Sequence, residues 1–367
     1  MCSFPLRVFA LTTLLAMSAC AGDGPDEEED DETLFGDADT DADADADSDA
    51  DLDTDTDIPP VIASVELVWS KTGLSGNVMG VGVSAEADVV VAASNGREIA
   101  GWNLAGDRNF DDVWSDPEWL DLELSPDGTS LIAGGDYDNG GQILDSRTGA
   151  LIAEVACLGN NGITGVAWSA RGDFVAVTAT NGSIGSEPEY CLFETESWDT
   201  LIEFGGDVGY DYDDVAFTPS GDILGVLGDE WLSAQNVYTD DNGFVDTGLD
   251  ILLRGRLTWL DEDVFAFASY DEDFVYLGSL SEPTGFGWWF EQAGVTNLAV
   301  SPDGNFMAMT LEDGTLAIAS LATRDGWVWE EIPHAAGAYS VRWSEDGNYL
   351  VSGGSQPSVA LWHVVYE

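Results

Sequence analysis

Hydrophobic positions beyond residue 60 come in short runs of Val, Leu, Ala, Trp and Phe, and these runs are punctuated by Gly and Asp. Runs of this kind, bounded by turn-forming residues, are typical of β-strands. No segment has the spacing of a convincing long amphipathic helix. The pattern therefore predicts an all-β domain built from many short strands.

One phrase recurs through this region, and it consists of an apolar strand, a turn of the Ser-Pro-Asp-Gly kind and a second apolar strand. Examples are "LELSPDGTSLIAGG" and "LAVSPDGNFMAMT". The residue that opens the turn occurs at seven places: Ser84, Ser125, Ser169, Thr218, Leu260, Ser301 and Ser344. These places are 41, 44, 49, 42, 41 and 43 residues apart. Proline presets φ in such a turn and glycine accepts a positive φ, so each copy is expected to form a hairpin.

Two more apolar strands follow the hairpin, as in "GTLAIASL" and then "GWVWEEI". Four antiparallel strands per repeat of roughly 40 residues correspond to one blade of a β-propeller. The 23 residues after Ser344 provide only two more strands, so we expect residues 62–73 to supply the missing outer strand of the last blade. The prediction is a seven-bladed propeller over residues 61–367, closed by an N-terminal strand that leaves no exposed sheet edge.

The repeated phrase resembles that of the WD-repeat β-propeller family. In the last unit His334 lies ten residues before Ser344, as in the family's Gly-His phrase, and Trp362 stands at the Trp of the Trp-Asp pair. Pro333 replaces the family's Gly, and His363 replaces its Asp. The resemblance implies a divergent WD-like propeller with a structural His334, in which the family's buried His-Ser-Asp-Trp hydrogen-bond network is interrupted.

Most of the 14 tryptophans fit this fold as packing residues. We expect three of them at the ends of inner strands (Trp168, Trp259 and Trp343) and four on outer strands (Trp288, Trp289, Trp327 and Trp329). Large rings fill the wedge between blades, while an aromatic platform for a sugar or peptide stays open as an alternative.

The N-terminus reads "MCSFPLRVFALTTLLAMSAC", with one positive charge followed by an apolar run too short to span a membrane. Its end, "MSAC", resembles the lipobox of bacterial lipoproteins, although Met17 stands where that family usually has Leu. The resemblance implies that residues 1–19 are removed and that Cys20 carries the lipid. An ordinary signal peptide cleaved near Ala19 is the alternative. The expected location is a bacterial membrane, the outer membrane or cell surface rather than the inner membrane.

Residues 20–60 are expected to form a disordered, Asp-rich linker. Eleven aspartates occupy alternate positions from Asp37 to Asp57, with only Ala, Thr, Ser and Leu between them. Such a segment cannot bury a core, and its charges repel one another and extend the chain. The stretch lacks the Gly or Asn that would fold a calcium loop, so we interpret it as a stalk.

Acidic residues dominate the whole chain, with 70 Asp and Glu against 10 Lys and Arg. The part from Ile58 onward still has 51 acidic and 9 basic residues. A field of this sign repels nucleic acids and anionic lipid headgroups, so we expect no nucleic-acid binding and membrane contact only through the lipid.

Cysteine usage leaves one candidate pair. Cys2 would leave with the signal peptide and Cys20 would be acylated, which leaves Cys157 and Cys191. Outside the cytoplasm such a pair is a disulfide candidate, and two separate buried thiols are the alternative.

Sequence motifs for catalysis are lacking, because the chain has only two histidines and no recognisable nucleophile elbow, phosphate loop or zinc pattern. We expect no catalytic or cofactor-binding residues, although a carboxylate pair among so many acids stays open. Two acidic loops have oxygens that could suit calcium (Asp136, Asp138, Asn139 and Asp145; Asp240, Asp241, Asn242 and Asp246), but polar turns between strands explain both loops without any ion.

A propeller offers a binding face at one end of its channel, and the loop with Tyr210 and Tyr212 among acids is a candidate part of that face. The expected function is a monomeric, lipid-anchored module that binds or scaffolds a protein partner at the cell envelope without catalysis. The alternatives are a carboxylate-based glycan-active enzyme and a calcium-dependent adhesion or surface protein.

Overall fold

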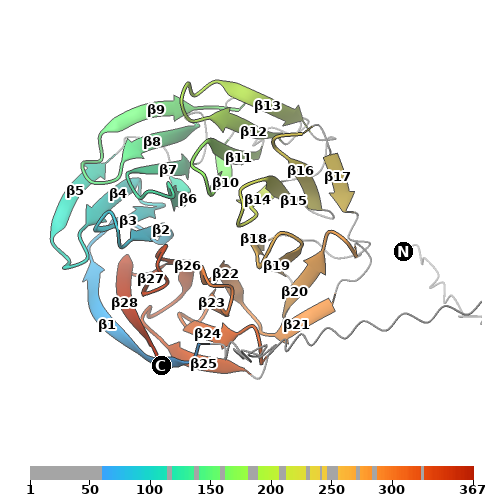
Figure 1. The fold of residues 1–367 in the computed structure, drawn as a ribbon. Helices are drawn as coiled ribbons and strands as arrows, with labels where there is room; N and C mark the ends of the chain where they lie inside the picture. Colours follow the sequence, from blue (N-terminus) through green and yellow to red (C-terminus); the bar gives the residue numbers. More distant parts are fainter. Residues whose placement is uncertain are drawn as a thin grey trace, which may run out of the picture. The chain divides into compact units, whose positions relative to one another are not determined.

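The computed structural model describes residues 60–367 except 114–117, 136–139, 158–161, 181–188, 206–211, 229–231, 240–241, 246–254, 270–272, 283–286 and 324–325. These residues belong to one compact unit that spans Asp57–Glu367. The unit contains seven four-stranded antiparallel sheets arranged as blades around a central axis (Figure 1). The seven-bladed β-propeller predicted from the repeat is therefore confirmed.

The blades are numbered along the chain, and in the first six the strand order from the axis outward follows the sequence. Blade 1 is formed by β2 (Val78–Ser84), β3 (Val89–Ser94), β4 (Glu98–Trp102) and β5 (Arg108–Val113). Blade 2 is formed by β6 (Trp119–Leu124), β7 (Ser130–Gly135), β8 (Gly141–Asp145) and β9 (Leu151–Val155). Blade 3 is formed by β10 (Gly162–Trp168), β11 (Phe174–Thr180), β12 (Glu189–Glu194) and β13 (Thr200–Gly205).

The next three blades repeat the same order. Blade 4 is formed by β14 (Tyr212–Phe217), β15 (Ile223–Gly228), β16 (Leu232–Asn236) and β17 (Asn242–Val245). Blade 5 is formed by β18 (Gly255–Trp259), β19 (Val264–Ser269), β20 (Phe274–Ser279) and β21 (Gly287–Glu291). Blade 6 is formed by β22 (Val295–Val300), β23 (Phe306–Leu311), β24 (Leu316–Ser320) and β25 (Trp327–Glu331).

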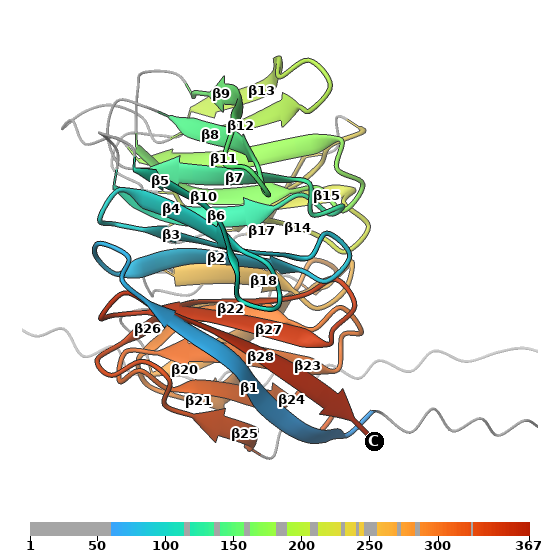
Figure 2. The ribbon, with the colours of Figure 1, turned by 90° about the vertical axis from the view of Figure 1, so that its left-hand side faces the viewer.

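Blade 7 closes the ring with both ends of the domain. Its inner strands are β26 (Ala338–Trp343), β27 (Tyr349–Gly354) and β28 (Ser358–Tyr366), and its outer strand is β1 (Ile62–Thr72). β1 runs antiparallel to β28 from Ile62, opposite Tyr366, to Thr72, opposite Ser358 (Figure 2). The expected N-terminal outer strand is thus present, and it covers the edge that β28 would otherwise expose.

The core lies between blades, because each sheet is covered on both faces by its neighbours. This explains why a strand such as β3, "VVVAAS", is buried at every position instead of alternating. Between blades 1 and 2, Val91 and Ile99 pack with Trp119 and Leu122. Between blades 7 and 1, Leu361 packs with Val81. The tryptophans occupy the inner and outer strands that the sequence predicted, and Trp119 and Trp102 are among the largest fully buried side chains.

The hairpin turns are stabilised as the repeated phrase predicts. In the turn of blade 2, Asp127 Oδ1 accepts hydrogen bonds from Ser125 Oγ at 2.6 Å and from the Thr129 amide at 3.0 Å. Gly128 has a φ of 67°, a backbone conformation that residues with a Cβ rarely adopt. The described residues form strands and turns, and no helix long and apolar enough to cross a bilayer occurs among them.

His334 lies fully buried in blade 7, in agreement with its expected structural role. Its Nε2 is 3.0 Å from Ser352 Oγ, which also accepts a hydrogen bond from Trp362 Nε1 at 3.3 Å. Its Nδ1 is 2.6 Å from Ser358 Oγ. The expected interruption of the family's network is therefore only partial. The His-Ser-Trp hydrogen bonds persist, and the Ser358 hydroxyl lies within hydrogen-bond distance of the second ring nitrogen.

Candidate functional site: the central channel

Seven equivalent residues, one from each innermost strand, define the centre of the ring. Each lies four positions before the residue that opens the hairpin turn, and we call this set the axial ring: Gly80, Asp121, Gly165, Asp214, Arg256, Asn297 and Ser340. In six blades a β-bulge precedes this residue and shifts the register of the inner strand. β18 has no such shift, and it carries Arg256.

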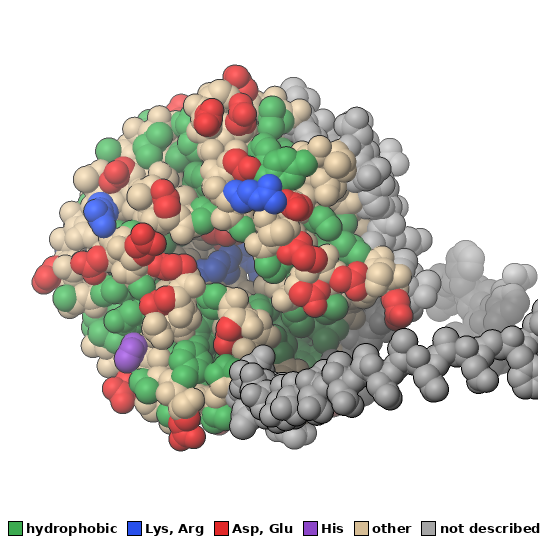
Figure 3. All heavy atoms as spheres, in the orientation of Figure 1, with side chains coloured by type: hydrophobic (Ala, Val, Ile, Leu, Met, Phe, Trp, Pro, Cys, Tyr) green, Lys and Arg blue, Asp and Glu red, His purple; other side chains and the backbone are tan. Residues whose placement is uncertain are grey.

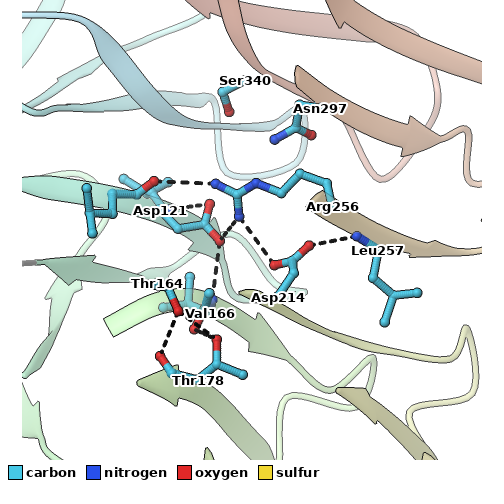
Figure 4. Close-up of polar contacts among 12 residues, drawn as sticks. Asp121, Thr164, Val166, Thr178, Asp214, Arg256, Leu257, Asn297 and Ser340 are labelled. Atoms are coloured by element: carbon cyan, nitrogen blue, oxygen red, sulfur yellow. Dashed lines mark hydrogen bonds and ion pairs between the residues drawn. The ribbon is translucent and has the colours of Figure 1, made fainter. Parts of the chain in front are cut away.

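Three axial-ring side chains connect their blade to the next one through its backbone. Asp121 Oδ2 accepts a hydrogen bond from the Val166 amide at 3.2 Å, and Asp214 Oδ2 accepts one from the Leu257 amide at 2.8 Å (Figure 4). Ser340 Oγ does the same for the Val81 amide at 3.2 Å, across the closing seam of the ring. Three members of the axial ring therefore link adjacent blades.

Glycines make room for these links. A Cβ placed on Gly165 would lie 2.9 Å from Asp214 Oδ1 and 2.7 Å from Thr178 Oγ1, and one on Gly80 would lie 2.5 Å from the Leu122 amide nitrogen. The hydroxyl oxygens of Thr178 and Thr164 are also 3.3 Å apart (Figure 4). Small residues in blades 1 and 3 thus allow the neighbouring side chains to reach the backbone.

Arg256 joins two aspartates at the centre. Its Nη1 donates to Asp121 Oδ2 at 3.0 Å and to Asp214 Oδ1 at 3.3 Å, and Nη2 donates to the Leu120 carbonyl at 3.5 Å (Figure 4). All three charged side chains are buried. Burial raises the pKa of Asp214 and Asp121 adds to that effect, while the positive charge of Arg256 opposes it. Arg256 therefore offsets part of the negative charge of the two aspartates.

Two positions further along each inner strand, blade 2 contributes Glu123 and blade 7 contributes Arg342. Burial raises the pKa of Glu123 to about 8; the nearby Arg342 lowers it, and Asp121 and Asp214 reinforce the increase. The side chain is surrounded by protein, yet part of it faces the open volume of the channel. Glu123 is therefore protonated, and able to donate a hydrogen bond, at neutral pH.

These groups line a cavity of about 330 Å³ that opens among the inner hairpin turns of blades 4 to 7. Its polar lining includes Glu123, Asp214, Arg256, Asn297 and Arg342, and its apolar walls are Trp168, Phe217, Trp259, Val300 and Trp343. A smaller cavity of about 180 Å³ on the side of blades 1 and 2 shares Glu123, Arg342 and Trp343 with it. Figure 3 shows basic side chains within the hollow at the ring's centre and acidic side chains around its rim.

The walls are held by the tryptophans at the ends of inner strands. Trp259 Nε1 donates to the Ala216 carbonyl at 3.0 Å, and Trp343 Nε1 donates to the Ala299 carbonyl at 3.1 Å, in each case in the preceding blade. Trp168 occupies the equivalent place in blade 3. The aromatic lining is thus part of the same set of contacts between blades that orders the polar floor.

The sequence-predicted site residues lie elsewhere. Cys157, after β9, and Cys191, on β12, form a disulfide with Cα atoms 5.8 Å apart that joins blades 2 and 3. Tyr212 begins β14, opposite Gly228, whereas Tyr210 and the lipid-attachment candidate Cys20 lie outside the described residues.

Little of the two candidate calcium loops is described. Asp136, Asp138, Asn139, Asp240, Asp241 and Asp246 lie outside the described residues, and Asn242 begins β17. Asp145 is described, and its Oδ1 accepts hydrogen bonds from the Arg147 amide at 3.2 Å and from the Thr148 amide at 2.8 Å. Among the described residues, no group of three or more His, Cys, Asp or Glu side chains is arranged to hold a metal ion. Calcium binding by these loops stays a prediction.

The axial ring was missed by motif searching, although the alignment of the repeats contains it. Reading four positions before each turn-opening residue gives Gly, Asp, Gly, Asp, Arg, Asn and Ser, a polar column inside strands that are otherwise apolar. A polar residue at one fixed place in a buried strand is a signal that a search for catalytic motifs does not use.

Comparison with known protein families gives one match on the last blade. The family model described as "WD domain, G-beta repeat" matches residues 330–363. This segment contains His334, Ser352 and Trp362, the three residues of the buried network described above. The seventh repeat is thus similar to a WD repeat, and the chain folds as a WD-like seven-bladed propeller.

Proposed function

We propose that this chain is a lipid-anchored protein of a bacterial envelope whose propeller binds a protein partner without catalysing a reaction. The lipobox-like "MSAC" and the acidic stalk before the propeller support the anchored location. The WD-like fold is consistent with a scaffold that binds other proteins. The protein acts as a monomer in this proposal, because β1 already closes its ring.

The observation that carries the proposal is the cavity at the centre of the ring. Concave sites with apolar walls and a few placed polar groups are the usual form of binding sites. This cavity opens among hairpin turns from several blades, including Pro219, Pro302 and Glu345. A partner seated there would contact residues that are far apart in sequence and fixed by the ring.

The partner is tested by photocrosslinking in the native host. A photoreactive residue replaces Pro302, which is exposed at the cavity mouth, or Glu330, which is exposed on β25 at the outer edge, as a matched control. We expect one dominant adduct from position 302 and none of the same mass from position 330. Equal adducts from both positions, or none from position 302, would count against partner binding at the channel.

The anchor is tested separately by fractionation. The Cys20→Ala form should move from the membrane fraction to the soluble fraction, because it has lost the residue that carries the lipid. A Cys2→Ala form provides the matched control and should stay in membranes. If the Cys20→Ala form remains membrane-bound, the lipid anchor is wrong, whatever the result of the crosslinking.

A specific observation also favours the glycan-active alternative. Glu123, protonated at neutral pH, and Asp214 line one cavity together with Trp259 and Trp343, and a protonated carboxyl beside aromatic walls suits a general acid. Release of reducing sugars from envelope polysaccharides by the wild type, abolished in Glu123→Gln, would support this activity. The same low signal from both proteins would remove it.

A further inference from the structure

Arg342 has hydrogen-bonding capacity that its partners among the described residues do not use. Its Nη1 donates to Asn297 Oδ1 at 3.1 Å and to the Val341 carbonyl at 3.0 Å. Its Nη2 lies 3.9 Å from Asp121 Oδ1, which is too long for a hydrogen bond. The side chain is 26% exposed and lines the cavity, so its outer edge faces the open volume.

Asn297 beside it carries a second unused donor. The amide is fully buried, and its orientation is fixed because Oδ1 must face the guanidinium of Arg342. Nδ2 is therefore the atom left over, and it has no hydrogen-bond partner among the described residues. Because Nδ2 has almost no accessible surface, Asn297 acts by fixing the guanidinium of Arg342 and not by contacting a ligand itself.

The charges around these donors do not repel an anion. Arg256 and Arg342 are the basic groups of the cavity, and they offset Asp121 and Asp214. Glu345 at the rim is engaged by the neighbouring blade, because its carboxylate accepts hydrogen bonds from Ser84 Oγ at 3.1 Å and from the Ala85 amide at 3.1 Å. Surface acids farther away are screened beyond about 8 Å at physiological salt.

The cavity walls specify the rest of the ligand. Trp168, Trp259 and Trp343, with Phe217, give an aromatic lining above the polar floor. Such walls favour a flat apolar group, and the volume of about 330 Å³ suits a body of one or two rings.

We infer that the cavity binds a carboxylate borne on an aromatic or similarly apolar group, with Arg342 donating to the carboxylate and Asn297 positioning Arg342. A carboxylate brings two acceptor oxygens in one plane, which suits the planar N–H donors of the Arg342 guanidinium. The carboxylate belongs to a free small acid or to the C-terminus of a chain, and the site requires the same chemistry from both. This inference goes beyond the proposed function, because a free acid would bind whether or not a protein partner exists.

Calorimetric titration of the full chain at pH 7 tests the site with four probes. These are phenylacetate, the uncharged phenylacetamide, a short peptide that ends in a free Phe carboxylate, and the same peptide as its C-terminal amide. We expect binding of at least one acid and none of its matched amide. Binding of phenylacetate identifies a free acid as sufficient, and binding of the peptide acid alone identifies a chain terminus. No binding by either acid, or equal binding of acid and amide, overturns the inference.

Two variants assign the binding to the residues named. Asn297→Asp keeps the oxygen that accepts from Arg342 and so preserves that contact, but it adds a negative charge beside the guanidinium that should bind the acid. Arg342→Gln removes the guanidinium itself. Each should weaken binding of the acid at least tenfold. The matched control is Asn109→Asp on the exposed part of β5, which makes the same chemical change outside the cavity and should bind as the wild type does.

The pH profile gives a readout that a purely structural role would not produce. Glu123 is neutral below about pH 8 and ionises above it, under the influence of Arg342, Asp121 and Asp214, and Arg256 and Glu345 line the same cavity. Binding of the acid by the wild type should weaken as pH rises from 7 to 9, and Glu123→Gln should bind equally at both. Unchanged melting temperatures establish that the variants are folded. Wild-type affinity in a folded Asn297→Asp or Arg342→Gln variant overturns the assignment.

Discussion

His334 is a single buried residue whose protonation is coupled to folding. Burial lowers its pKa from 6.5 to about 4, because the charged ring would lose its hydration inside blade 7. Its two ring nitrogens face Ser352 and Ser358, and no acid in the described network stabilises the charged form. Because the pKa is lower in the folded state, the stability that this group contributes is present above pH 6.5 and is lost as pH falls through 4.

The first prediction follows from this shift. At about 1.36 kcal/mol per pKa unit, this shift lowers the free energy of unfolding by about 3 kcal/mol when the pH falls from 7 to 4. The His334→Gln variant should be less stable at pH 7 and should lose less stability on acidification than the wild type. Urea unfolding at pH 7, 6, 5 and 4 measures this difference, with His363→Gln as the matched control. Parallel pH profiles for the wild type and His334→Gln would contradict the prediction.

Arg256 shows a second consequence of burial at the residue scale. Its guanidinium pairs with Asp121 and Asp214 at the centre of the ring. Removing the guanidinium leaves both carboxylates without this partner. Breaking a buried pair in this way typically costs about 3–5 kcal/mol, whereas an exposed pair is worth less than about 1 kcal/mol.

The second prediction compares two arginines on these grounds. Arg256→Met should lower the free energy of unfolding by about 3–5 kcal/mol at pH 7, because both aspartates lose the guanidinium that donates to them. Arg171→Met is the matched control, since Arg171 pairs with Asp222 on the surface, and it should cost less than about 1 kcal/mol. Guanidinium unfolding monitored by tryptophan fluorescence gives both values. Similar costs for the two variants would show that the central cluster does not hold the ring together.

At the scale of strands and blades, the disulfide adds a covalent connection to the hydrogen bonds between blades 2 and 3. Cys157 and Cys191 are both buried within one hydrophobic cluster, together with Ile163 and Val177 of blade 3 and Ile143 of blade 2. The pair encloses a chain segment of 34 residues. Closing a loop of this length in the unfolded chain corresponds to about 4 kcal/mol in the chain-entropy account.

The third prediction is that the double variant Cys157→Ala with Cys191→Ala loses about 2–4 kcal/mol of unfolding free energy relative to the oxidised wild type. Alanine suits the apolar surroundings better than serine, so the change isolates the covalent link. Chemical unfolding with and without dithiothreitol measures it. Reductant should bring the wild type close to the double variant and leave the double variant unchanged; a wild type that is insensitive to reductant would contradict the role of the bond.

The sequence alone predicted some elements of the structure and not others. The hairpin phrase predicted every blade, because Ser125 and its equivalents open turns whose chemistry is local. The closing pair of β1 and β28 was also predictable, since counting residues after Ser344 left one strand missing. The axial ring was not predicted as a site, because Asp121 meets Arg256 across 135 residues and only the assembled ring brings them together. Likewise, burial and not local sequence makes Glu123 a neutral acid.

The whole molecule depends on β1, which joins the start of the domain to its end. β1 pairs with β28 along its full length, and its Trp69 donates a hydrogen bond to the Leu104 carbonyl of blade 1 at 2.9 Å. Without β1, β28 would present a row of unpaired backbone groups along an edge, and such edges recruit strands from other molecules.

The fourth prediction separates the role of β1 from that of the Asp-rich segment before it. A chain that begins at Pro60 retains β1 and should be a monomer with the stability of the longer protein. A chain that begins at Gly73 lacks β1, and it should melt at a lower temperature and form dimers or larger species through the exposed edge of β28. Light scattering after size-exclusion chromatography gives the oligomeric state, and thermal unfolding gives the stability. A peptide of residues 60–73 added to the shorter chain should restore the monomer, because it can pair with β28 as β1 does; a stable monomer without the peptide would show that three strands suffice for the last blade.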